Sequence, residues 1–280
     1  MKKTNDWIAT KILSKQPFMV SRFGNTELQI VITVYMERLF GSTCQSEERF
    51  KQWLPRGWEW SGLFPPDKKF AYEFTDLLIE CSKESDLLGT FFCYMDDYII
   101  TEYLPNAQLT YLTSMEPWLA ANPWSAALKG LKVLVIHPFE DSIRSQYERR
   151  EALFPGKNVL PEFELLTLKS VQTIAGNIDP RFDTWFEALD YMYEESLKMD
   201  FDIALIGCGA YGMPLAAKLK KAGKQAIHLG GALQLLFGIK GKRWVDDPVT
   251  KIKFNDSWVY PDEAEAPKNS INVENNCYWQ

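Results

Sequence analysis

The stretch "DIALIGCGAYGMPLAAKLKKAG", residues 202–223, has the pattern of a buried strand followed by a glycine-rich turn and a helix. Its first residues form a short apolar run, and the later ones repeat apolar residues at helical spacing. Across the turn, Gly207, Gly209 and Gly212 spell G-x-G-x-x-G. In a dinucleotide-binding fold, a turn of this kind meets the pyrophosphate of the ligand at a helix N-terminus.

The same alternation of strand and helix recurs along the chain. Capping signals and apolar periodicity predict strands at 17–24, 86–94, 131–139, 163–168, 201–206 and 225–230, and helices at 1–16, 25–41, 67–82, 140–154 and 181–199. Thr26 and Gln29 are spaced as a capping box, and the tryptophan- and proline-rich segment 57–67 is expected to be a loop. The alternation predicts one Rossmann-like α/β domain over residues 1–280, with a mostly parallel twisted sheet, helices on both faces, helical insertions and an extended tail over 256–280.

Composition limits the classes of function. The chain has 280 residues, 46% hydrophobic residues and a net charge of −6, which disfavours a broad nucleic-acid surface. No apolar run approaches the ~18–20 residues of a membrane span, and we expect a cytoplasmic protein. The cysteines show no C-x-x-C spacing and are expected to be reduced core thiols; they are Cys44, Cys81, Cys93, Cys208 and Cys277.

The second half of a dinucleotide signal is missing from this chain. An acidic residue about 20 positions after the turn would hold the ribose, but residues 213–245 contain six Lys, one Arg and no Asp or Glu. NAD is therefore disfavoured, whereas an enzyme that uses NADP or S-adenosylmethionine remains an alternative, as does a turn whose glycines only allow close packing. The basic character of the segment favours a phosphate group bound at the turn, with Tyr211 on it and with His228, Gly230 and Gly231 on the turn "HLGGALQ".

A second turn with candidate functional residues is "SRFGNTEL", residues 21–28. It places Arg22, Asn25 and Glu27 at the end of a predicted strand and in the first turn of the following helix. A glutamate in a first helical turn also has a purely structural explanation, because it interacts favourably with the helix dipole. The residues alone leave both explanations open.

This turn resembles the R-[FY]-G-D-G-E turn of bacterial glycosyltransferases of the GT-D type, with Arg22-Phe23-Gly24-Asn25-Thr26-Glu27 as the matching residues. The segments "VIHPFEDSIRSQY" (135–147) and 206–241 are similar to later parts of those proteins. The resemblance implies transfer of a sugar from a nucleotide-diphosphate donor, expected to be a UDP-sugar, to a hydroxyl of a surface glycan, polysaccharide or glycoprotein. It also implies that Glu27 lies beside the donor diphosphate and its metal ion. A nucleotide-sugar binding module without catalytic activity is a further alternative.

One departure from the family pattern concerns the metal. Asn25 replaces the Asp of Asp-x-Glu, so that an Mn²⁺ or Mg²⁺ ion held by Glu27 would lose an anionic ligand and metal dependence should be weak. The diphosphate would then be neutralised by Arg22, His137, Arg144 and the basic segment. In "YMDDY" (94–98), Asp96 and Asp97 are either solvated residues at a strand end or a second metal ligand or base.

Overall fold

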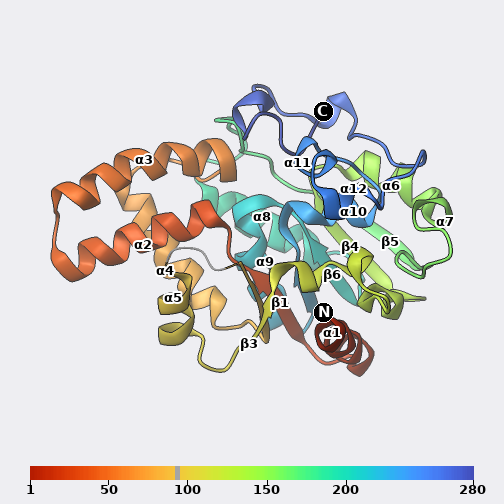
Figure 1. Ribbon diagram of the computed structural model, residues 1–280. Helices are drawn as coiled ribbons and strands as arrows, with labels where there is room; N and C mark the ends of the chain where they lie inside the picture. Colours follow the sequence, from red (N-terminus) through yellow and green to blue (C-terminus); the bar gives the residue numbers. More distant parts are fainter. Residues whose placement is uncertain (92–94) are drawn as a thin grey trace.

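Seven parallel strands form the centre of the fold in the computed structural model, which describes residues 1–91 and 95–280 (Figure 1). The strands lie in the order β3-β2-β1-β7-β6-β4-β5. Their bounds are β1 (Phe18–Arg22), β2 (Leu87–Thr90), β3 (Gln108–Tyr111), β4 (Lys132–His137), β5 (Glu164–Lys169), β6 (Ile203–Ile206) and β7 (Gln225–His228). The prediction of a Rossmann-like α/β fold is confirmed, and all the strand pairs are parallel.

Helices cover both faces of this sheet, because alternate residues of each strand point to opposite sides. On β4, Leu134 and Ile136 belong to one apolar core, and Val133 and Val135 belong to the other. The first core includes residues of α2 (Asn25–Phe40), α3 (Cys44–Ser61), α4 (Lys68–Ser82), α5 (Asp96–Tyr103), α8 (Trp185–Leu197) and α9 (Gly212–Lys221). The second core includes residues of α1 (Lys2–Ser14), α6 (Glu140–Glu148), α7 (Arg150–Leu153) and α10 (Leu233–Leu236). Burial on both faces explains why inner strands such as β4 and β6 are nearly continuous apolar runs, whereas the edge strand β3 is mostly exposed.

Short helical segments connect these elements. They are the α-helical turns α11 (Lys242–Val245) and α12 (Pro248–Lys251) and the 3-10 segments η1 (Leu112–Met115), η2 (Pro117–Leu119), η3 (Trp124–Leu128), η4 (Gly209–Tyr211), η5 (Gly230–Ala232), η6 (Glu263–Glu265) and η7 (Ser270–Asn272). Within the described ranges, none of the helices combines the length and the apolar character that crossing a membrane requires.

The strand order creates a topological switch point between β4 and β6. The chain leaves β4 through α6 and joins β5 on one side, whereas it leaves β6 through α9 and joins β7 on the opposite side. The two connections therefore diverge above the carboxyl ends of neighbouring strands. In open α/β sheets, this is where ligands bind.

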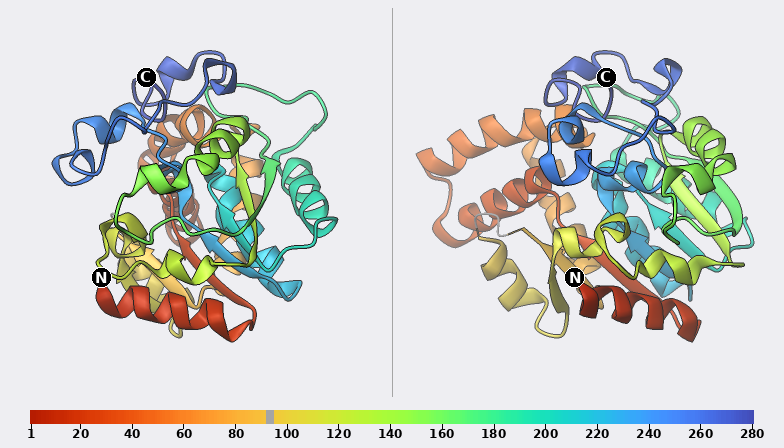
Figure 2. Two further views of the ribbon diagram at one scale, coloured as in Figure 1. Left: turned by 90° about the vertical axis from the view of Figure 1, so that its right-hand side faces the viewer. Right: turned by 45° about the vertical axis from the view of Figure 1, so that its right-hand side comes forward.

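The C-terminal segment lies across the same end of the sheet, far from α1 (Figures 1 and 2). Glu265 is buried and accepts hydrogen bonds from the Asp141 backbone N–H (2.9 Å) and the Ser142 hydroxyl, which ties the segment to the start of α6. Trp60 of α3 donates its indole N–H to the carbonyl of Asn272 (3.2 Å). The predicted tail over 256–280 is therefore a fixed cover of the carboxyl edge that includes η6 and η7.

The structure corrects several sequence-based expectations. Residues 57–61 are helical, because Gly57 lets α3 pack on α2: a Cβ at this position would lie 2.7 Å from the Ile30 side chain. The predicted capping box at Thr26 is wrong, because α2 begins at Asn25, with Gly24 as its N-cap, so Thr26 already lies inside the helix. Cys44 is exposed rather than part of the core. The predicted strand at 86–94 is observed as Leu87–Thr90, and its positions 92–94, with Cys93, lie outside the described residues.

Candidate active site at the carboxyl edge of the sheet

A cavity with an empty volume of about 560 Å³ lies at the switch point. It is bounded by the loops that follow β4, β5, β6 and β7, by the end of α3 and by the C-terminal segment. Its lining includes Ser61, His137, Gly207, Gly209, Tyr211, Gln234, Tyr278 and Trp279. None of the described residues that line it is Asp, Glu, Lys or Arg.

The three glycines of the G-x-G-x-x-G turn have different roles. Gly207 and Gly209 line the cavity, and Gly209 has a positive φ of 58°, which few side chains tolerate. Gly212 instead faces His228, and a Cβ at this position would overlap the imidazole ring. Part of the predicted phosphate turn therefore serves packing, because Gly212 makes room for the His228 ring and does not line the cavity.

Both histidines end a strand, as predicted, and both are buried and neutral. Burial lowers the pKa of His137 to about 3, and burial together with the nearby Arg22 lowers the pKa of His228 to about 3. His137 accepts the Phe139 backbone N–H at Nδ1 (3.0 Å), so that its proton is on Nε2. His137 can thus donate a hydrogen bond into the cavity it lines, but it cannot supply the positive charge that we expected from the sequence.

Two other residues of the cavity have buried polar atoms without a hydrogen-bond partner among the described residues. They are the amide oxygen of Gln234 and the indole N–H of Trp279. The amide orientation of Gln234 is fixed, because its nitrogen donates to the carbonyls of Lys240 (3.0 Å) and Tyr278 (3.2 Å). Both atoms have almost no exposed surface, and five other described residues that do not line this cavity also have unpaired buried polar atoms, so these two atoms do not by themselves indicate a bound ligand.

A second cavity, with an empty volume of about 640 Å³, adjoins the first. Both are lined by Gly231 and Tyr278, and a Cβ at position 231 would overlap the Tyr278 ring. The remaining lining residues of this second cavity are Arg22, Leu112, Met115, Glu116, Leu229, Ala232, Arg243 and Trp244. The two cavities therefore differ in charge, because two guanidinium groups line the second and none lines the first.

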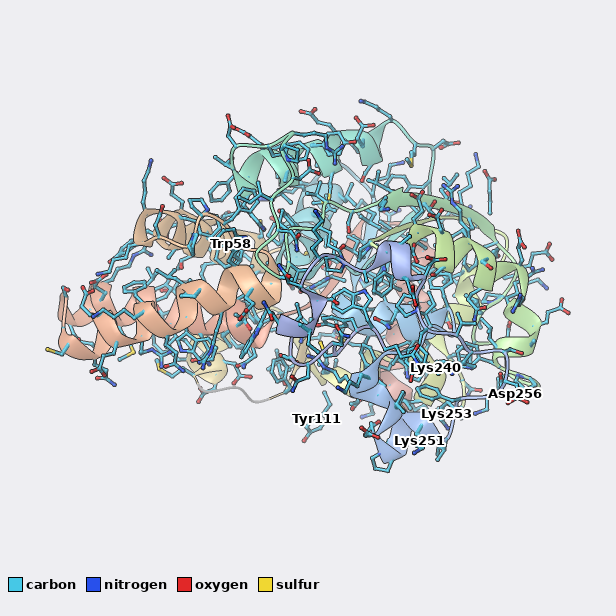
Figure 3. The ribbon with its side chains drawn as sticks, turned by 90° about the horizontal axis from the view of Figure 1, so that it is seen from above. Trp58, Tyr111, Lys240, Lys251, Lys253 and Asp256 are labelled. Carbon is cyan, nitrogen blue, oxygen red and sulfur yellow. The ribbon has the colours of Figure 1, made fainter. Side chains whose placement is uncertain are left out.

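Arg243 is fixed by the C-terminal segment. It forms an ion pair with Glu274, its Nη1 donates to the Tyr278 hydroxyl (3.3 Å), and its guanidinium lies 4.9 Å from the centre of the Tyr278 ring. In Figure 3, which looks onto this end of the molecule, Lys240 and Lys253 lie on the same side, and Trp58 of α3 lies across from them. The segment that follows β7 and the C-terminal segment thus form one side of the second cavity together.

At the N-terminal turn, Arg22 ends β1 and Glu27 lies in the first turn of α2, as predicted. The Glu27 carboxyl folds back over Gly24 and accepts hydrogen bonds from its own backbone N–H and from Ser61. Burial raises the pKa of Glu27, and the charge of Arg22 opposes this shift. Glu27 lines neither cavity, but it connects Ser61 of the first cavity with Arg22 of the second.

The residues at this turn do not fit a divalent metal. In the described part of the chain, no group of three or more His, Cys, Asp or Glu side chains is arranged to hold one. The Asn25 side chain is exposed, and its oxygen accepts from the Gln29 amide (3.4 Å). We therefore derive no step through a metal ion.

Several other predicted residues are not brought to the two cavities. Arg144 points to the outer strand, where it binds Thr167 (2.7 Å) and Glu140 (2.6 Å). Asp96 and Asp97 begin α5 and line neither cavity. Three lysines of the basic segment form ion pairs in the last turn of α9, away from the carboxyl edge: Lys218 with Asp190, Lys220 with Asp86, and Lys221 with Glu84.

The sequence analysis did not single out Glu116, Gln234, Tyr278 and Trp279 as site residues, and it included Arg243 only as part of the basic segment. Only Gln234 and Arg243 had a signal, since they lie in the block 206–241 or just after it. Glu116 and the two aromatic residues lie far from any motif, and only the tertiary fold brings them to the site.

Comparison with protein-family models, with curated proteins and with solved structures gave no match. A functional assignment therefore depends on the geometry and chemistry of the two cavities.

Proposed function

We propose that the protein is a glycosyltransferase that moves a sugar from a nucleotide-diphosphate donor, a UDP-sugar, to a hydroxyl group of a glycan or glycoprotein acceptor. The observation that supports this proposal most strongly is the pair of adjoining cavities, of which one is uncharged and the other contains two arginines. A nucleotide has the same division, with a neutral base at one end and an anionic diphosphate at the other.

The uncharged cavity suits a pyrimidine base. Uracil carries an N–H between two carbonyl oxygens, and side chains that can form hydrogen bonds line the cavity, among them Ser61, His137 and Gln172. Aromatic residues in its wall, among them Trp60 and Tyr278, provide flat surfaces for the ring. A charged base or carboxylate would find no counter-ion among the described residues that line this cavity.

The charged cavity suits the diphosphate and the sugar. Arg22 and Arg243 can donate paired hydrogen bonds to phosphate oxygens, and their positive charge would stabilise the UDP that leaves. Glu27 acts on this site through its charge beside Arg22, as a positioning residue. Trp244 and Tyr278 add apolar surface for the faces of a sugar ring.

The test is an activity measurement on the full chain with a panel of labelled UDP-sugars. We expect at least one of them to release UDP, by hydrolysis or by transfer to a supplied acceptor, and we expect this activity to persist in EDTA. NADPH and S-adenosylmethionine serve as competitors, and tight binding of either with no response to any UDP-sugar would contradict the proposal. Binding of UDP-sugars without turnover, with every acceptor class supplied, would instead favour a binding module.

A further inference from the structure

Glu116 is the one carboxylate among the described residues that line the two cavities. It follows η1, beside the end of β3, and reaches the cavity that contains Arg22 and Arg243. It therefore lies on the side where the proposed function puts the diphosphate and the transferred sugar, away from the uncharged cavity. The sequence resemblance gave no role to this residue.

Transfer to a hydroxyl requires a group that takes its proton, and the other candidates fit this task poorly. His137 lines the uncharged cavity, and its Nδ1 is occupied by the Phe139 N–H. His228 lines neither cavity, and its Nδ1 contacts the Ile206 carbonyl (3.3 Å). Glu27 also lines neither cavity and is bound to Ser61.

We propose that the second cavity also receives the acceptor and that Glu116 is the general base that takes the proton of its hydroxyl. In this step the acceptor O–H bond breaks and the proton passes to a Glu116 carboxylate oxygen. The acceptor oxygen forms a bond to the anomeric carbon of the sugar, and the bond from that carbon to the phosphate oxygen breaks. UDP leaves with the electron pair of that bond, beside Arg22 and Arg243. This inference depends on the proposed function.

The surroundings of Glu116 are consistent with this role. Burial and the nearby Asp247 carboxylate raise the pKa of Glu116 to about 7, where a general base works well at neutral pH. The other charged or titratable groups that line the cavity are Arg22, Arg243 and Tyr278, and Glu274 neutralises part of the Arg243 charge. Turnover should therefore rise with pH and level off above about pH 7, as Glu116 loses its proton.

The experiment compares Glu116→Gln with Glu116→Asp and with the control Glu164→Gln, which changes an exposed carboxylate at the start of β5. Glu116→Gln should bind UDP as the wild type does, lose at least a hundredfold in turnover and lose the rise of activity with pH. Glu116→Asp should keep more activity than Glu116→Gln, and Glu164→Gln should behave as the wild type. Turnover of Glu116→Gln within threefold of wild type, with the same pH profile, would overturn the inference.

A measurement of thermal stability checks the state of Glu116 without any activity. Because the folded state raises this pKa, the folded protein binds the proton more tightly than the unfolded chain between about pH 4.5 and 7. The contribution of Glu116 to stability then falls as the pH rises through this window. The difference in melting temperature, Glu116→Gln minus wild type, should therefore increase between pH 5 and pH 8. If the wild type releases no UDP from any donor, the proposed function itself fails. The melting experiment would then still report the protonation state of Glu116, because it does not depend on activity.

Discussion

Replacing Arg22 with glutamine is expected to lower transfer from a UDP-sugar at least a hundredfold and to weaken UDP binding at least tenfold, about 1.4 kcal/mol. Arg22 lines the cavity proposed for the diphosphate, and a hydrogen bond to a charged group contributes about 1.5–3 kcal/mol. Uridine, which has no phosphate, should bind both proteins equally. Calorimetric titration of each protein with UDP and with uridine measures the difference.

Arg144→Gln is the matched control for this experiment. The sequence proposed Arg144 as another cation for the diphosphate, but the structure has it on the outer strand with Thr167 and Glu140. Its replacement should leave UDP binding unchanged. Equal losses in both variants, or a loss of uridine binding in Arg22→Gln, would count against a specific phosphate site at Arg22.

Trp279→Ala is expected to lower the free energy of unfolding by about 3–5 kcal/mol, which is typical of removing a buried aromatic side chain. Trp279 is 5% exposed and packs edge-on against Phe139, with ring centres 6.0 Å apart. Loss of this contact should release the C-terminal segment from the carboxyl edge and open both cavities. Chemical denaturation measures the loss, and UDP binding should weaken in parallel.

Two further tryptophan variants separate packing from hydrogen bonding. Trp279→Phe keeps an aromatic ring and removes the indole N–H, which has no partner among the described residues. It should cost less stability than Trp279→Ala and leave UDP binding close to that of the wild type, because this N–H has almost no exposed surface. Trp60→Ala removes a half-exposed indole from the same cavity and should cost clearly less stability than Trp279→Ala. A stable Trp279→Ala protein would show that the C-terminal segment is held elsewhere.

Much of the fold was predictable from the sequence, because its signals are local. Apolar runs followed by glycine turns mark β1, β6 and β7, and the helical spacing of apolar residues over 181–199 marks α8, which begins at Trp185. Residues 57–61 were missed because their tryptophans and glycine suggest a loop, whereas their packing against α2 stabilises a helix. Tertiary contacts override local propensity in this segment.

The candidate site was predictable only where its residues follow strands. His137, Gly207, Gly209 and Arg22 end or follow β4, β6 and β1, and a parallel sheet brings such residues to one edge. Charge was misleading, because the basic segment 213–245 supplies one arginine to the site while several of its lysines form ion pairs at the far end of α9. Tyr278 and Trp279 come from a C-terminal segment whose path depends on contacts such as that of Glu265 with Ser142.

Calorimetric titration of the wild-type protein with UDP in the presence of EDTA tests the central claim most directly. The two adjoining cavities predict saturable binding of one UDP per chain without a divalent metal, with an affinity that exceeds those of uridine and pyrophosphate taken separately. An absence of saturable binding at millimolar UDP would contradict the claim that the carboxyl edge of this sheet is a nucleotide-diphosphate site.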